Sequence, residues 1–341
     1  MDAEVKVLTW LWLLSTLLIL LIACQSRPLA VTETTPTAFI TPSMSVSERL
    51  AVKPLPRSNH ALAYDSKRHV VVLFGGWSDK GELLGDTWEY DGTTWQKIAT
   101  PTSPPARADL SLAYDAERGI TMLFGGITSD SSYTSDVWFY DGQTWQQTEP
   151  SHQPPPRHSA ALVYDPVEQA MLLFGGYGSG GQLHDTWKFN GTTWQEMEFL
   201  SAGPPITLPQ MVYDSRREVF VLRSVVNVTT FEYDRSTWSH APLKPEKELR
   251  IPILGFRMAY DIDRGLTVLF GGEAPAGQEG MWEYDGEKWY RPSVAALPPT
   301  RLYHAMIYDE ARGVVVLFGG LADGTYLNDT WEYDGVTWKQ K

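Results

Sequence analysis

The sequence predicts an all-β fold, a six-bladed β-propeller made of four-stranded antiparallel blades. A block that recurs six times, with a period of about 50 residues, carries this prediction, because a period of that length is typical of propeller blades. Each copy contains a Tyr-Asp marker, whose tyrosines are Tyr64, Tyr114, Tyr164, Tyr213, Tyr260 and Tyr308. Each copy then ends on a tryptophan, at Trp95, Trp145, Trp194, Trp238, Trp289 and Trp338.

The first copy shows how one blade is expected to form. Residues 60–65 (HALAYD) form the innermost strand a, and residues 70–76 (VVVLFGG) form strand b, which is apolar on both faces like a strand between neighbouring sheets. Residues 86–91 (DTWEYD) form strand c with side chains alternating between faces. The Asp-Gly pair at 91–92 supplies a tight turn into strand d at Trp95. One such sheet has two apolar faces, so six units are expected to bury them by packing around an axis.

A glycine pair ends strand b in five of the six copies, at Gly75-Gly76, Gly125-Gly126, Gly175-Gly176, Gly271-Gly272 and Gly319-Gly320. A period near 50 residues that combines such a pair with spaced aromatic residues resembles the kelch repeat. The resemblance covers residues 55–341. It implies a scaffold for binding more than any single activity, since one fold hosts many functions.

Two enzymatic branches of kelch-like propellers bear on function. The sugar-oxidase branch needs a Cys–Tyr crosslink beside copper, and no cysteine lies in the propeller region, so this branch is excluded. The sialic-acid epimerase branch stays open. The resulting hypotheses are a non-catalytic binding module for a protein or glycan, an enzyme acting on an acidic sugar, and a structural envelope protein. No cofactor is predicted.

The N-terminus predicts a membrane anchor. Residues 7–23 are nearly all apolar, about the length of a signal-peptide core, and they end in Leu21-Ile22-Ala23-Cys24. This ending resembles the lipobox of bacterial lipoproteins, which makes Cys24 the candidate lipid-attachment site. The alternative is an uncleaved anchor, since the only basic residue ahead of the apolar run is Lys6. Both interpretations place the rest of the chain outside the cytoplasm, attached to the bacterial cell membrane or envelope.

The predicted organisation has three parts. Residues 1–24 form the signal peptide with lipobox, or the anchor, and residues 55–341 form the propeller. Residues 25–54 are rich in Thr, Ser and Pro and are expected to be a flexible tether, because such a composition buries too little apolar surface to fold alone. We expect the propeller to be monomeric.

Charge and cysteine content exclude several partners. The chain has 28 basic and 41 acidic residues, which argues against nucleic acid, a partner that calls for a basic surface. Cys24 is the only cysteine, so neither an internal disulfide nor a Cys-based metal cluster can form.

Strand parity indicates which face binds. In an up-and-down sheet the a–b and c–d turns lie on one face, here called the turn face, and the b–c and d–a connections lie on the other, the loop face. The turns are short and alike, whereas the b–c loops differ among the copies, as in WSDKGELLG, ITSDSSYTS and LADGTYLN. Because variable loops on a rigid scaffold usually carry binding, the protein or glycan ligand is expected at the loop face.

An arginine stands seven residues before the Tyr marker in four copies, at Arg57, Arg107, Arg157 and Arg301. Isoleucine replaces it in the other two, at Ile206 and Ile253. Arginine suits bidentate recognition of a carboxylate or phosphate, so these four residues are candidate ligand contacts. The alternative is that they brace the blades through backbone carbonyls or repeated acidic residues.

His60 and His304 stand four residues before the marker, in blades that become neighbours when the ring closes. They are further ligand-binding candidates, as a general base or as metal ligands. Packing inside the blades is the alternative. No third ligand stands in register with them, so no metal site is predicted.

Overall fold

The computed structural model describes residues 53–198, 204–223, 229–241, 251–252, 254–274 and 280–341. The chain divides into two units, Met1–Arg49 and Leu50–Lys341, and the description below concerns the second. The predicted anchor, Cys24 and nearly all of the predicted tether lie outside the described residues. Within the described part there is no helix with the length and apolar character needed to cross a membrane.

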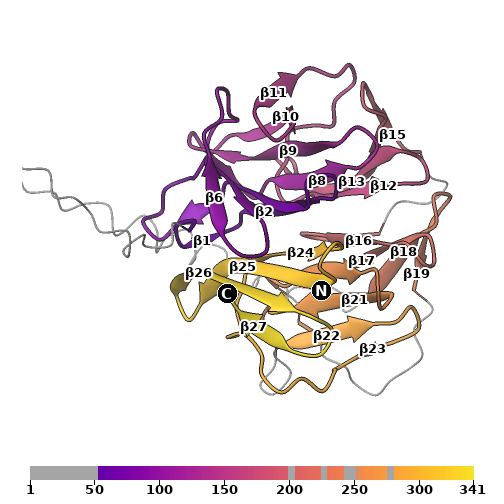
Figure 1. Ribbon diagram of the computed structural model, residues 1–341. Helices are drawn as coiled ribbons and strands as arrows, with labels where there is room; N and C mark the ends of the chain where they lie inside the picture. The colour runs from indigo at the N-terminus through magenta and orange to yellow at the C-terminus, as the bar shows by residue number, and fades with distance from the viewer. Residues whose placement is uncertain (1–52, 199–203, 224–228, 242–250, 253, 275–279) are drawn as a thin grey trace, which may run out of the picture. The chain divides into compact units, whose positions relative to one another are not determined.

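The fold is the predicted six-bladed β-propeller, in which each blade is a four-stranded antiparallel sheet (Figure 1). Blade one consists of β2 (Ala61–Asp65), β3 (Val70–Phe74), β5 (Thr87–Tyr90) and β6 (Trp95–Ile98). Blade two consists of β8 (Ser111–Asp115), β9 (Ile120–Thr128), β10 (Tyr133–Tyr140) and β11 (Trp145–Thr148). Blade three consists of β12 (Ala161–Asp165), β13 (Ala170–Gly178), β14 (Gly181–Phe189) and β15 (Trp194–Glu196).

The second half of the propeller repeats this arrangement with shorter strands in blades four and five. Blade four consists of β16 (Gln210–Asp214), β17 (Val219–Arg223), β18 (Thr230–Tyr233) and β19 (Trp238–His240). Blade five consists of β20 (Arg257–Asp261), β21 (Leu266–Phe270), β22 (Met281–Tyr284) and β23 (Trp289–Tyr290). Blade six consists of β24 (Ala305–Asp309), β25 (Val314–Ala322), β26 (Thr325–Tyr333) and β27 (Trp338–Gln340). Three short strands, β1 (Arg57–Ser58), β4 (Trp77–Ser78) and β7 (Arg107–Ala108), pair at the loop face.

The ring closes through contacts between its first and last blades. Each innermost strand contacts the next, in the order β2, β8, β12, β16, β20 and β24, and β24 returns to β2. Blade six has its own fourth strand, β27. Residues 46–52 could add a further strand beside β27. These residues lie outside the described part, so this strand stays a prediction.

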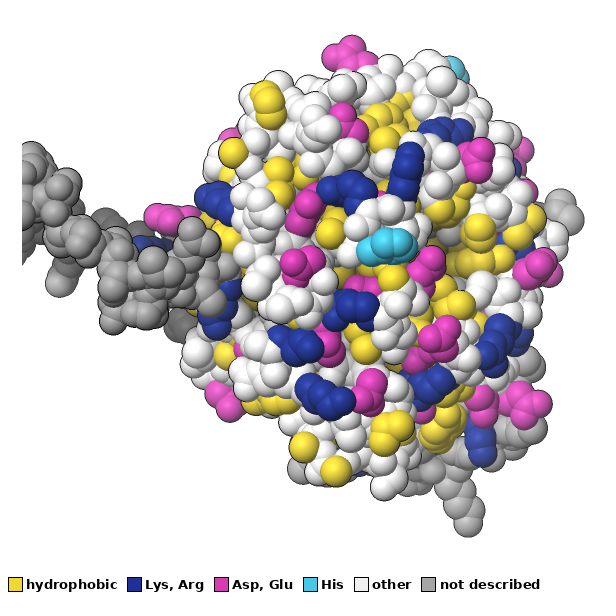
Figure 2. Space-filling model, viewed as in Figure 1, with side chains coloured by type: hydrophobic (Ala, Val, Ile, Leu, Met, Phe, Trp, Pro, Cys, Tyr) yellow, Lys and Arg dark blue, Asp and Glu magenta, His cyan; other side chains and the backbone are white. Residues whose placement is uncertain are grey.

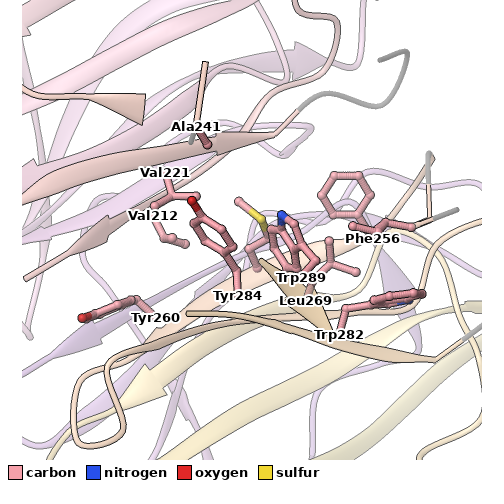
Figure 3. Close-up of a cluster of buried hydrophobic side chains, with 11 residues drawn as sticks. Val212, Val221, Ala241, Phe256, Tyr260, Leu269, Trp282, Tyr284 and Trp289 are labelled. Carbon is pink, nitrogen blue, oxygen red and sulfur yellow. The ribbon is translucent and has the colours of Figure 1, made fainter. Parts of the chain in front are cut away.

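The core lies between the blades rather than within any one of them. Figure 3 shows one of these interblade clusters, in which Val212 and Val221 of blade four pack against Tyr284 and Trp289 of blade five. In five of the six blades the closing tryptophan also hydrogen-bonds the preceding blade. Trp95 Nε1 donates to Thr330 Oγ1 at 2.8 Å, which joins blade one to blade six. Each blade is therefore stabilised by both of its neighbours.

The glycine pair marks a close approach of neighbouring backbone. Gly75 has φ +75°, and a Cβ there would lie 2.5 Å from the carbonyl oxygen of Arg107 in the next blade. Gly76 donates its backbone N–H to that same carbonyl at 2.9 Å. A side chain at Gly75 would separate two blades, and one at Gly76 would clash with Ser58 and His60 of its own blade.

Candidate functional site

The four repeat arginines have the same geometry in blades one, two, three and six. In each, Nη1 and Nη2 bind the two carboxylate oxygens of an aspartate at 2.6–2.9 Å, and Nη1 also donates to a glycine carbonyl at 2.9–3.0 Å. The pairs are Arg57–Asp86, Arg107–Asp136, Arg157–Asp185 and Arg301–Asp329. The arginines are at most 1% exposed. This is the bracing arrangement, and direct ligand contact by these side chains stays a prediction.

Each of these aspartates also accepts a hydrogen bond from the tryptophan two residues later, as in Trp138 Nε1 to Asp136 Oδ2 at 2.6 Å. Burial alone would raise the pKa of Asp136, but the hydrogen bond and charge of Arg107 outweigh it and lower the pKa below its usual value. The aspartate is thus held ionised between a guanidinium and an indole, which fixes the start of strand c to the segment entering its blade.

These aspartates were not predicted as functional residues, although the sequence carries a signal for them. The Asp-x-Trp triplet is present in the four blades that have the arginine. Blade four has Ile206 in place of the arginine and Thr229 in place of the aspartate. Blade five has Ile253 and Gly280 at these two positions. The arginine and the aspartate are therefore present together or absent together, as expected of partners in a structural pair.

His60 and His304 are 3% and 0% exposed and lie in apolar packing. Their rings meet Phe318 and Phe270 edge-on, at centroid distances of 5.5 and 5.8 Å. Burial first, and then the positive charges of neighbouring arginines, hold the pKa of both imidazoles well below the usual value. Among the described residues no group of three or more His, Cys, Asp and Glu side chains is placed to hold a metal ion.

We expect these two histidines to make the propeller sensitive to mild acid. The unfolded chain takes up protons near pH 6.5, whereas the folded chain keeps both rings neutral. Their contribution to stability is therefore full above pH 6.5 and is lost as the pH falls below it, by about 1.4 kcal/mol per histidine per pH unit. Denaturant unfolding measured between pH 7 and 5 checks this.

Two of the other blades supply matched substitutions for this measurement. Leu110 occupies the position of His60 in blade two, and Phe256 occupies the position of His304 in blade five. The double variant His60→Leu/His304→Phe should keep its neutral stability and lose most of the slope between pH 6.5 and 5. An unchanged slope would show that other groups carry the acid sensitivity.

A cavity of ≈ 420 Å³ follows the axis of the ring and is lined by the six innermost strands from one end to the other. We call it the central channel. More than half of its lining residues are Ala, Val, Leu, Ile, Met, Phe or Pro, so its walls are largely apolar. The charged residues among its described lining are Asp109, Arg257 and Glu310. A cavity of this size, with a few polar groups in an apolar wall, matches the usual anatomy of a small-molecule site.

The residue five before each marker has a left-handed backbone, with φ between 49° and 73°. These six residues form the mouth ring, namely Asn59, Asp109, Ser159, Leu208, Gly255 and Tyr303. The backbone N–H of Asp109 donates to the carbonyl of Asn59 at 2.9 Å, and the N–H of Ser159 donates to that of Asp109 at 2.7 Å. Asn59 and Tyr303 continue the same pattern across the junction of blades one and six. Left-handed backbone at Leu208 and Tyr303 is costly for such side chains, and strain of this kind collects at functional sites.

The polar side chains of the mouth ring lie together over blades one to three. Asn59 Nδ2 donates to Asp109 Oδ1 at 2.5 Å, and Ser159 Oγ lies 3.4 Å from the same oxygen. Asp109 also acts electrostatically on Arg257 and Tyr303, on the other side of the ring. Burial lowers the pKa of Arg257, and Asp109 partly opposes that shift. The channel mouth thus carries charges of both signs.

Basic and acidic side chains are interspersed on the molecular face shown in Figure 2. Most described arginines of the turn face follow this rule, because they pair with a marker aspartate, whereas the guanidinium of Arg216 donates to the backbone carbonyl of Asp263. Arg68 contacts Asp65 and Arg312 contacts Asp309, both at 2.7 Å. These ion pairs build no extended surface of a single charge. The turn-face arginines instead contribute to the packing of the blades.

Comparison with known proteins agrees with the geometry. The family model described as the KLHDC2/KLHL20/DRC7 Kelch-repeats domain matches residues 92–210. No curated protein matches the chain significantly. Among solved structures, the one titled "Structure of YjhT" is similar in fold, with a TM-score of 0.63 and 14% sequence identity over 85% of this chain and 98% of that chain. At that identity the likeness concerns the fold alone.

Proposed function

Because the chain is a kelch-repeat β-propeller, we propose that it is an exported, membrane-tethered binding module that engages a protein or glycan ligand without catalysis. The fold itself suggests a protein-interaction module. The observation that carries the proposal is the position of the variable loops, which border the mouth of the central channel.

Short strand pairings fix this position. The segment entering each of five blades pairs with the b–c loop of the same blade, as in Arg57 with Ser78, Arg107 with Thr128, and His158 with Tyr177. The residue after the glycine pair differs from blade to blade and is at least partly exposed, as Trp77, Ile127, Tyr177, Glu273 and Leu321. A rim of different side chains on a rigid backbone is well suited to selective recognition.

Site-specific photocrosslinking in cells tests which face engages a partner. A crosslinking residue at Tyr326, in the b–c loop of blade six, should capture a discrete partner. The same residue at Val336, which is 71% exposed in a turn of the same blade, is the matched control and should capture little. A glycan screen of the purified chain, with thermal shift as the readout, covers the glycan case. Equal capture from both faces, with no glycan response, would contradict the proposed binding face.

Tethering through Cys24 is a separate part of the proposal, supported by the apolar run that ends in Leu21-Ile22-Ala23-Cys24. We expect Cys24→Ala to abolish metabolic labelling with a fatty-acid analogue and to block processing or release the protein from membranes. Ser26→Ala, two residues beyond the cysteine, is the control and should label normally. Persistent labelling of Cys24→Ala would refute the lipid site, whereas an unlabelled wild-type protein that stays in the membrane would identify an uncleaved anchor.

A further inference from the structure

The central channel is asymmetric at its second layer. The residue three before each marker lines the channel, and these six positions form the channel ring, namely Ala61, Ser111, Ala161, Gln210, Arg257 and Ala305. Four of them are alanine or serine, and the two long polar side chains stand in the adjacent blades four and five. The same two blades lack the buried Arg–Asp pair. Space is therefore left on the side of blades six, one, two and three, facing Gln210 and Arg257.

Arg257 differs from the other arginines of the inner propeller in its partners. The repeat arginines and most of the turn-face arginines are held by carboxylates. The guanidinium of Arg257 donates from Nη1 to the carbonyl of Phe256 at 3.0 Å, and among the described residues no carboxylate lies within ion-pair distance of it. A cation in a largely apolar channel without a carboxylate in direct contact costs stability, which a structural role does not explain.

We infer that the central channel is a binding site for a small carboxylate ligand, whose carboxylate pairs with Arg257 and whose hydroxyl or amine groups meet the polar side of the mouth ring. This inference rests on the proposed binding function and names the ligand class of that same face.

The charges favour a carboxylate over a phosphate. Arg257 is the only cation among the described lining residues, and Asp109 and Glu310 are both acidic. A single guanidinium matches the single charge and the planar shape of a carboxylate, whereas a phosphate dianion would bring a second charge without a partner. Asn59, Asp109 and Ser159 provide acceptors and donors for neutral groups of the same ligand. The channel volume of ≈ 420 Å³ suits a molecule of monosaccharide size.

Glucuronate and glucose are suitable probes, because they share a sugar ring and differ in the carboxylate. We expect glucuronate, and not glucose, to raise the melting temperature of the full chain and to give a calorimetric binding signal. Arg257→Ala gives blade five the alanine that blades one, three and six carry at this position. It should weaken glucuronate binding by roughly ten- to a hundredfold. Gln210→Ala is the control for loss of a channel side chain and should have a smaller effect.

A second readout does not depend on the ligand. Since no carboxylate of the described residues is in ion-pair contact with Arg257, Arg257→Ala without ligand should melt at the same temperature as the wild type or at a higher one, as when a residue kept for function is removed. A clearly lower melting temperature would make Arg257 a structural residue and overturn the inference. Equal binding of glucose and glucuronate, tighter binding of glucose 6-phosphate, or no binding of glucuronate would overturn it as well. Those results leave the photocrosslinking test of the loop face unaffected, so the two proposals fail separately.

Discussion

Deleting blade six, from Pro299 to the C-terminus, should abolish cooperative folding of the whole propeller. The deletion exposes the face of blade one that packs against Val316 and Phe318. It also exposes the face of blade five that packs against Val315 and Leu317. Several hundred Å² of apolar surface, at roughly 25 cal/mol per Å², amounts to about 10 kcal/mol or more. That equals the whole stability of an ordinary domain, about 5–15 kcal/mol.

The polar links across the same junctions add to this loss. Tyr90 donates to Glu332 at 3.0 Å, and Trp95 loses its acceptor Thr330. On the other side, Glu283 loses the hydroxyl of Tyr333, a contact of 3.2 Å. Buried polar groups without partners cost further free energy, so no compensation is expected at either exposed face.

Calorimetry and size-exclusion chromatography of the truncated chain measure this outcome. We expect aggregation, or a soluble fraction without a cooperative transition. A chain lacking only residues 1–52 is the control, and it should keep a single transition because the ring is complete from the first innermost strand to β27. A soluble five-bladed chain with one sharp transition would show that the blades do not depend on ring closure.

The fold was predictable because its signals repeat. The Tyr-Asp marker, the glycine pair and the closing tryptophan recur at fixed positions, and each has a local cause, such as the contact of Gly75 with the carbonyl of Arg107. Six agreeing copies leave little room for another architecture. The pairing of strands within a blade and the closure of the ring then follow from the need to bury both faces of each sheet.

The candidate site was less predictable, because it depends on differences between copies rather than on the repeat. The arginine position was identified, but its partner Asp136 stands 29 residues later, and only the parallel absence of both in blades four and five indicates the pair. Arg257 replaces an alanine or serine of other copies at a position that looks like ordinary strand. Its significance comes from the absence of a nearby carboxylate among the described residues, which a sequence does not reveal.

The second large effect is expected from the repeat arginines. Arg107→Ala should lower the free energy of unfolding by about 3–5 kcal/mol, because it leaves the largely buried Asp136 without its cation. The carbonyls of Gly125 and Pro105 lose a donor as well. A parallel change at Arg157, whose contacts with Asp185 and Gly175 have the same geometry, should have a similar effect.

The pH dependence of this loss has a definite sign. In the wild type the pKa of Asp136 lies below its usual value, so the stabilisation by the ion pair is present above about pH 4 and is lost as the pH falls through the lower, folded-state pKa. In Arg107→Ala the carboxyl loses the hydrogen bonds and the charge of Arg107, so its pKa rises relative to the wild type, although the hydrogen bond from Trp138 remains. The difference in stability between variant and wild type should therefore be largest at neutral pH and shrink below pH 4.

A double variant separates the bracing role from ligand binding. Arg107→Ile/Asp136→Thr copies the residues that blade four carries at these positions, Ile206 and Thr229, and removes the unpaired charge together with its partner. Replacing a buried ion pair by uncharged residues is often nearly neutral, so the double variant should recover more than half of the stability lost in Arg107→Ala. Bracing also predicts that glucuronate affinity per folded molecule is the same in both variants and in the wild type. Lost affinity at unchanged stability would instead place Arg107 in contact with the ligand, which requires the guanidinium to leave Asp136.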